Sequence, residues 1–115
     1  MQASRIFFVA RELTAWFFRR RLRFKIVNDS MEPTLLDSDF VLVRKSSTAS
    51  EGSVVLAQHP EVEGLRVVKR LKDASSQGFF LESDNSEGTD SHSWGYLPAI
   101  DGEVTLVLNR LGQSV

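Results

Sequence analysis

The sequence LRVVKRL, residues 65–71, decides the fold class because one of its two faces is almost wholly apolar. Side chains two residues apart share one face of a β-strand. The face expected to meet the core holds Leu65, Val67, Lys69 and Leu71. A lysine there is exceptional, since a fully buried ammonium is so costly that the group tends to lose its proton. Residues 65–71 therefore predict a buried strand that carries an amine.

Four further runs of β-forming residues surround this strand, separated by clusters of Gly, Ser, Asp and Asn. They cover residues 40–44, 53–58, 79–82 and 104–108. A chain of 115 residues that is 42% hydrophobic is long enough for one core and too short for two. The sequence therefore predicts a compact, mostly antiparallel β-domain.

Residues 1–25 differ from the rest in period and in charge. They carry seven Arg and Lys against one Glu, whereas residues 26–115 carry seven against fourteen Asp and Glu. On a helical wheel one apolar stripe holds Ile6, Val9, Ala10, Leu13, Trp16 and Phe17, with Arg5, Arg11, Glu12 and Arg19 largely opposite. We therefore expect an amphipathic basic helix over residues 1–25 in front of a β-domain over residues 26–115.

This helix has two possible roles. Its apolar stretch, residues 6–18, is too short to cross a bilayer, which needs roughly 20 apolar residues. It can pack on the core of its own domain, or residues 5–25 can lie in the interface of an anionic leaflet. We expect a cytoplasmic protein, with the second role placing it peripherally on the inner face of the membrane.

Composition removes several other classes of function. The chain has no cysteine and only His59 and His92, which lack ligand spacing, so we expect neither a metal site nor any other cofactor. The basic tract has no recognised reading motif beside it, so we expect no nucleic-acid partner.

Ser30 is the candidate nucleophile. It lies in the sequence NDSMEPTL, residues 28–35, before a turn stiffened by proline. A serine hydroxyl needs a base, and an uncharged amine can serve as one. For Lys69 to do so near neutral pH, its pKa must fall by roughly three units from about 10.4, or ~4 kcal/mol, which burial can supply. Residues 82–95 add hydroxyls and carboxylates that could orient the amine.

Each of these features also has an ordinary explanation. A serine before a turn is usually a cap, and a lysine in a strand usually extends its amine to solvent. A loop rich in Ser, Asp and Asn is usually a solvated series of turns. Only the combination of the three segments indicates an active site.

Taken in order, the segments resemble the boxes of the signal peptidase I family of serine–lysine proteases, from about Phe24 to Leu108. The residues that carry the resemblance are Ser30 to Thr34, Val68 to Arg70, Asp84-Asn85, Asp90-Ser91 and Trp94-Gly95. The small size and the lack of Pro-Gly-Asp after Arg70 look most like the branch that matures nickel-type superoxide dismutase. This resemblance implies an endopeptidase that removes a short leader from the dismutase precursor, with nickel belonging to the substrate.

The resemblance also implies roles for individual residues. Ser30 would be the nucleophile and Lys69 the general base. The backbone N–H of Ser30 and the side chain of Asn28 would hold the oxyanion. Met31 would line the pocket for the residue before the scissile bond. Pro33 would fix the turn and, with Met31, bind the substrate.

Several positions depart from the family pattern. Ser83 stands where the family usually has Gly, Ser53 where it often has Asp, and His92 where an Arg commonly pairs with the preceding Asp, here Asp90. The last box is also one residue short. The hydroxyl that orients Lys69 could then be that of Ser86, Thr89 or Ser91, and we expect Thr89.

The substrate should bind as an extended strand beside an exposed sheet edge. Three other functions compete with leader removal. One is a catalytically silent module that binds peptides or membranes. Another is a conventional signal peptidase, which the lack of a span disfavours. The third is a self-cleaving domain of the SOS-repressor type, but the chain has no Ala-Gly or Cys-Gly bond to cut.

Overall fold

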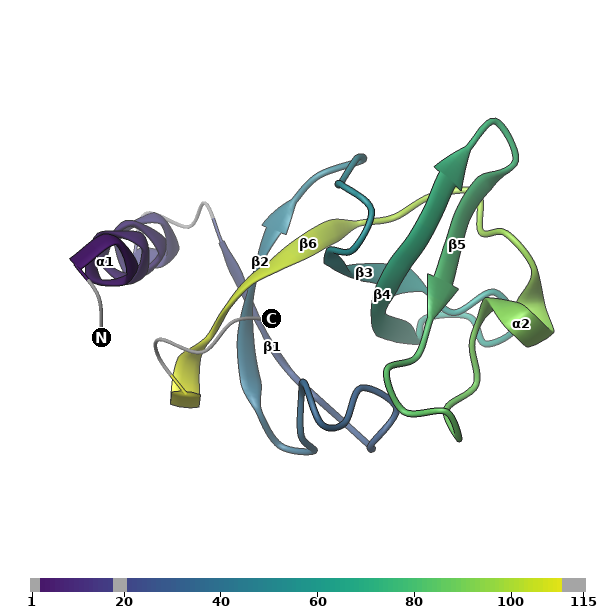
Figure 1. Ribbon diagram of the computed structural model, residues 1–115, viewed down its shortest axis with the longest axis horizontal. Helices are drawn as coiled ribbons and strands as arrows, with labels where there is room; N and C mark the ends of the chain where they lie inside the picture. The colour runs from purple at the N-terminus through teal and green to yellow at the C-terminus, as the bar shows by residue number, and fades with distance from the viewer. Residues whose placement is uncertain (1–2, 18–20, 111–115) are drawn as a thin grey trace.

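The computed structural model describes residues 3–17 and 21–110, in which six antiparallel strands form one curled sheet (Figure 1). The strands lie in the order β1-β2-β6-β3-β4-β5. Their bounds are β1 (Leu22–Lys25), β2 (Phe40–Lys45), β3 (Val54–Gln58), β4 (Arg66–Ser75), β5 (Gly78–Glu82) and β6 (Gly102–Val107). Helix α1 (Ala3–Phe17) lies at one end of the molecule and the short helix α2 (Ser91–Trp94) at the other, and a 3-10 helix, η1 (Leu108–Arg110), follows β6. The prediction of a mostly antiparallel β-domain preceded by one helix is confirmed.

The five strands predicted from the sequence correspond to β2 to β6. The main difference is that β4 continues from Leu71 to Ser75, because the added residues pair with β5 after a bulge between Leu71 and Asp73. The prediction that Leu65 belongs to the core is wrong. This residue precedes β4 and its side chain is exposed.

The prediction of one helix over residues 1–25 is wrong at its carboxyl end. Helix α1 ends at Phe17, and residues 22–25 form β1, which pairs with β2 so that Leu22 lies opposite Val43. In β1 the side chains of Leu22 and Phe24 are partly buried, while Arg23 and Lys25 are exposed. This alternation has the period of a strand. The first strand of the sheet therefore lies within the segment that we had assigned to the helix.

Strand β3 is buried on both faces and lies between two hydrophobic clusters. Val54 and Leu56 pack into the cluster that includes Met31 and Leu35, whereas Val55 and Ala57 pack into the cluster on the other face. Because β3 pairs with β4 residue by residue, with Val55 opposite Lys69, the lysine is surrounded by apolar side chains. The sheet thus supplies the dry environment that the sequence predicted for Lys69.

Helix α1 packs on β2 and β6 through a face that keeps Val9 and Leu13 of the expected stripe but is rotated toward Glu12 and Ala15. Val9 contacts Leu42 and Leu106, but Glu12, predicted to face away from the core, is completely buried. Trp16, predicted on the packed stripe, is 38% exposed. The side chains of Arg5, Ile6, Phe17 and Arg19 lie outside those that the structure describes. In the described residues no helix is long and apolar enough to cross a bilayer, and contact of α1 with lipid stays a prediction.

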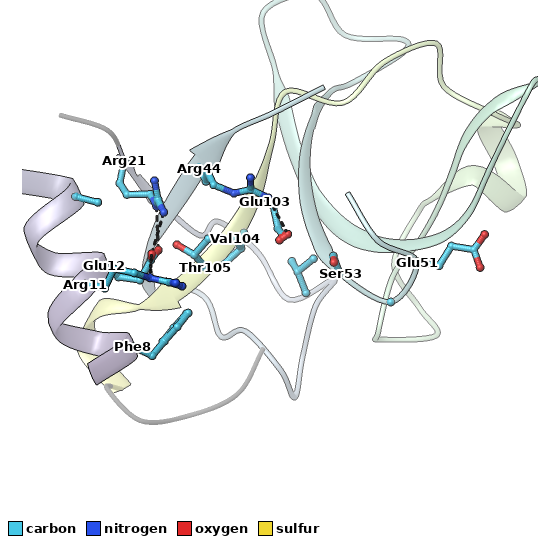
Figure 2. Close-up of a pocket in the computed structure, with 13 residues that line it drawn as sticks. Phe8, Arg11, Glu12, Arg21, Arg44, Glu51, Ser53, Glu103, Val104 and Thr105 are labelled. Atoms are coloured by element: carbon cyan, nitrogen blue, oxygen red, sulfur yellow. Dashed lines mark hydrogen bonds and ion pairs between the residues drawn. The ribbon is translucent and has the colours of Figure 1, made fainter. Parts of the chain in front are cut away.

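Glu12 is buried because Arg21 neutralises it. The Arg21 guanidinium donates to both carboxylate oxygens, with Nε at 3.0 Å from Oε1 and Nη2 at 2.9 Å from Oε2 (Figure 2). Burial raises the pKa of Glu12, but the hydrogen bonds from Arg21 and Thr105 outweigh it and hold this pKa below its usual value. A bidentate ion pair therefore joins the inner face of α1 to the segment that enters β1.

Replacement of Glu12 by glutamine should destabilise the protein by about 2 kcal/mol near neutral pH, because it leaves the Arg21 charge buried and unpaired. A carboxylate with a lowered folded pKa stabilises the fold above its unfolded pKa, and this contribution is lost as the pH falls through the folded pKa. The difference between the wild type and Glu12→Gln should therefore shrink below pH 4.5. Urea unfolding at several pH values measures it.

The matched control is Arg11→Gln. Arg11 also lies near Glu12, at 3.8 Å, but its side chain is 70% exposed. Exposed pairs contribute little, so this change should stay within about 0.5 kcal/mol. Equal losses in the two variants would show that the buried pair has no special role.

Candidate active site

Ser30 lies in a tight turn between β1 and β2, and neighbouring residues of the turn are buried in the core. Met31 and Leu35 are buried in the core, and the Leu35 N–H donates to the Met31 carbonyl at 2.9 Å. Asn28 has a φ of 72°, a conformation that asparagine tolerates better than most residues. The Ser30 side chain itself is only partly buried. The turn therefore presents Ser30 at the surface while its neighbours hold the backbone.

The segment after β5 binds this turn directly, and Figure 1 shows the two lying side by side. The Asn85 N–H donates to the Ser30 carbonyl at 2.9 Å, and the Asn85 amide donates to the Asp29 carbonyl at 3.1 Å. Two segments more than 50 residues apart in the sequence are thus joined at Ser30.

A second contact ties the turn to β4. The Arg70 guanidinium binds both oxygens of Asp84, at 2.7 and 3.2 Å, and the Thr34 hydroxyl donates to the same carboxylate. Burial raises the pKa of Asp84, but the hydrogen bonds from Arg70 and Thr34 outweigh it and hold this pKa below its usual value. Asp84 is therefore a charged link between β4 and the turn that carries Ser30.

Lys69 lies on β4 with only 4% of its surface exposed. Its Nζ donates to Ser83 Oγ at 3.0 Å and lies 5.9 Å from the centre of the Trp94 ring. Burial lowers the pKa of Lys69, and the Asp90 carboxylate offsets part of this effect. The environment therefore shifts Lys69 toward the uncharged amine, which is the form that can act as a base.

Ser83 is the residue that orients Lys69, and the prediction that the Thr89 hydroxyl does so is wrong. Thr89 contributes its backbone carbonyl, which accepts from Ser83 Oγ at 3.4 Å. Because the hydroxyl proton of Ser83 points to this carbonyl, its oxygen is free to accept an N–H from the lysine. The lone pair of an uncharged Lys69 amine is then left for another partner.

The sheet register explains this error. Arg70 lies opposite Glu82 and Leu71 opposite Leu81, so the next position along each strand places Ser83 opposite Lys69. Pairing of residues 65–71 with residues 79–82 in a hairpin would have placed Ser83 near Lys69 only approximately. The bulge between Leu71 and Asp73 shifts the pairing by one residue, and no feature of the sequence locates it.

Ser30 and Lys69 line one cleft of about 480 Å³. Gly88 lies between the two sides of this cleft: a Cβ placed there would be 2.5 Å from Ser83 Oγ and 2.9 Å from Ser30 Cβ. Any side chain at Gly88 would therefore push the two serines apart. In the described residues no hydrogen bond joins Ser30 to Lys69, and such bonds are often long without substrate. Their direct contact stays a prediction.

The other predicted site residues lie close by, with two changes of role. Asn28 is beside Ser30, but its Oδ1 accepts the Ser30 N–H at 3.1 Å instead of presenting a donor. Met31 lines the cleft as predicted, whereas Pro33 is exposed on the turn and does not line it. Asp90 accepts the Ser83 N–H at 2.8 Å and so supports the residue that orients Lys69.

Sequence reasoning missed His59, which lines the same cleft and packs against the Trp94 ring at 4.8 Å. Its Nδ1 accepts the N–H groups of Glu61 and Val62, at 3.0 and 3.1 Å. A neutral imidazole bonded in this way carries its proton on Nε2 and has no free lone pair. His59 is therefore a hydrogen-bond donor in this cleft and does not compete with Lys69 as the base.

A larger cleft of about 820 Å³ lies between α1 and the sheet (Figure 2). Two ion pairs occupy it, one between Arg21 and Glu12 and one between Arg44 and Glu103 at 3.4 Å. The cleft that contains Ser30 and Lys69 is smaller, but it holds both the candidate nucleophile and the candidate base. The smaller cleft is therefore the candidate active site, because of the residue types that line it.

Comparison with protein families finds a match to the family described as Peptidase S24-like over residues 19–93, which is more than half of the chain. The matched stretch contains Ser30, Lys69 and Ser83. No curated protein matches the chain.

Replacement of Lys69 by methionine should stabilise the protein near neutral pH, by about 1 kcal/mol or a few degrees in Tm. The folded pKa of Lys69 is lowered, so the unfolded chain binds more protons and the wild type gains stability as the pH rises toward 10.5. The advantage of Lys69→Met should therefore vanish near pH 10.5. Thermal unfolding across this pH range tests it.

The control for this comparison is Lys72→Met, because Lys72 is an exposed lysine on the same strand. It should leave the pH dependence of Tm unchanged. A neutral-pH loss of stability in Lys69→Met, or a gain that does not depend on pH, would contradict the proposed cost of burying the amine.

Proposed function

Because the chain belongs to the Peptidase S24-like family and is a serine peptidase, we propose that Ser30 is its nucleophile and Lys69 its general base. The observation that carries this proposal is the buried Lys69 amine, held by Ser83 at one side of the cleft that Ser30 lines. The resulting activity is that of an endopeptidase that cuts a short leader from a precursor protein.

The reaction follows from the hydrogen bonds of the amine. Lys69 donates one N–H to Ser83, and its lone pair takes the proton of the Ser30 hydroxyl as the oxygen attacks the peptide carbonyl. The new ammonium then gives this proton to the leaving nitrogen, which frees the amino product and leaves an acyl group on Ser30. Water attacks the acyl group with Lys69 as base, and the carboxyl product departs.

The oxyanion needs donors where the carbonyl oxygen becomes charged. The Ser30 N–H is one candidate, but it is bonded to Asn28 Oδ1. Substrate binding would replace this bond, and a rotated Asn28 amide could then offer its own N–H groups to the same oxygen. Each such donor typically contributes about 3–4 kcal/mol to transition-state stabilisation.

The substrate would add as a strand to the first half of β4. Pairing of β4 with β5 begins at Arg70, so residues 66–69 pair with β3 on one side only and face the cleft on the other. An unpaired edge of this kind binds extended peptides through backbone hydrogen bonds. A peptide there would pass Lys69 and reach Ser30 across the cleft.

The precursor that we propose as substrate is that of nickel-type superoxide dismutase. Support comes from the resemblance of the ordered segments around Ser30, Lys69 and Asp84, and nickel would bind the product. A peripheral position on the inner face of a membrane is part of the same proposal. The exposed side chains of Arg11 and Trp16 on α1 would make this contact.

A catalytically silent peptide-binding module is the second candidate. Two observations favour it: the Ser30 N–H is already bonded to Asn28, and no described hydrogen bond joins Ser30 to Lys69. Such a module would use the edge of β4 without turnover. Incubation with the dismutase precursor and mass spectrometry of the products separates binding from cleavage.

Ser30→Ala and Lys69→Met should each lower precursor cleavage by at least about a thousandfold, because the nucleophile and its base act as a unit. Both variants should keep the circular dichroism spectrum of the wild type. Ser47→Ala and Lys72→Met, which change exposed residues of the same types, should cleave normally. Cleavage retained in either active-site variant would refute the assignment.

The rate of cleavage should rise with pH, since only the free amine of Lys69 can take a proton. Burial lowers the pKa of Lys69, so the rise in kcat/KM should occur below pH 10.5. Rates measured from pH 5 to pH 11 with a fluorogenic leader peptide test this. A maximum well below pH 6 would indicate a different base.

A further inference from the structure

We propose that His92 is a positioning residue for Lys69, which it reaches through Asp90 and Ser83. The inference rests on the proposed function of Lys69 as the base. It adds an exposed side chain that binds Asp90, so that the charge at position 92 sets how strongly Asp90 acts on the amine.

The contacts form an unbroken chain of three steps. His92 Nδ1 lies 2.8 Å from Asp90 Oδ1, which also accepts the His92 backbone N–H at 3.0 Å. The second oxygen of Asp90 accepts the Ser83 N–H at 2.8 Å. Ser83 Oγ accepts from Lys69 Nζ at 3.0 Å. Any rotation of the Asp90 carboxylate would therefore move the residue that holds the amine.

The two ends of this chain differ in their access to water. The side chains of Asp90 and His92 are 9% and 63% exposed, respectively. Lys69 and Ser83, at the other end, are buried, with 4% and 7% of their surfaces exposed. His92 is thus the exposed member of this chain, and its charge can be changed by substitution without disturbing the buried side chains.

The charged groups around His92 define the sign of this effect. Among the described residues, two carboxylates lie within ion-pair distance of the ring: Asp90 at Nδ1, and Glu82 at 3.6 Å from Nε2. The Phe80 ring packs edge-on at 5.1 Å and carries no charge. Asp90 in turn faces His92 and, electrostatically, Lys69.

A negative Asp90 favours the ammonium form of Lys69 and raises its pKa. A cation at position 92 compensates Asp90 and should weaken this effect, so that Lys69 releases its proton at lower pH. A neutral side chain at position 92 leaves the full charge of Asp90 acting on the amine. The charge at position 92 and the basicity of Lys69 should therefore change in opposite directions.

The test follows the NMR signal of the Lys69 side chain in the full-length protein as the pH is raised. Loss of one signal in Lys69→Met assigns it. We expect the Lys69 titration in His92→Arg, which carries a permanent cation, to move to lower pH by roughly half a unit relative to the wild type. In His92→Phe, which cannot bind Asp90, it should stay at the wild-type position or move to higher pH.

The matched control is Ser93→Arg. It adds the same cation one residue further along α2, at an exposed side chain with no hydrogen bond to Asp90 in the described residues. Its effect on the Lys69 titration should be clearly smaller than that of His92→Arg. Equal shifts in the two variants, or no shift in His92→Arg, would overturn the inference.

Precursor cleavage provides a separate readout. In His92→Arg the rise in kcat/KM should move to lower pH together with the NMR titration, which a purely structural role of His92 would not produce. The NMR titration can shift as expected while neither the wild type nor any variant cleaves the precursor. In that case the proposed function fails, but the coupling of His92 to Lys69 stands.

Discussion

The hydrogen bond from the Lys69 amine to Ser83, made in a dry part of the sheet, is the interaction on which the rest of the site depends. It requires that β4 be buried at this point, which the doubly buried β3 beside it provides. It also requires that β5 end where Ser83 can meet Lys69. The amine is a candidate base because packing removes it from water while one hydroxyl still satisfies it.

Lys69 and Arg70 are neighbours on β4 but have different roles, because their side chains point to opposite faces of the sheet. Lys69 faces the cleft and carries the proposed chemistry. Arg70 faces the other way, where its ion pair with Asp84 and the bond from Thr34 tie the nucleophile turn to the strand. A salt-bridged link beside the cleft thus helps to hold the turn that carries Ser30 against the strand that carries Lys69.

Helix α1 is attached by a polar contact as much as by apolar packing. The buried pair of Glu12 and Arg21 lets the helix turn Val9 and Ala15 to the sheet while Trp16 remains exposed. A helix whose apolar residues are divided in this way can pack on its own domain and still offer an apolar side chain to another surface. The two roles expected for the segment are therefore compatible.

Local pattern was sufficient for the fold class and for five of the six strands, because alternation and turn chemistry act between near neighbours. Ser30 and Lys69 were chosen from the combination of three distant segments, and their catalytic roles stay a prediction. Local pattern failed for β1, because the alternation of partly buried and exposed residues there is only four residues long and lies beside a run of arginines. It also failed for Glu12, whose burial depends on Arg21. Ser83, Gly88 and His59 were also not recognised as parts of the cleft. Their positions follow from a bulge in β4 and from contacts between distant segments, which exist only once the sheet has curled and brought those segments together.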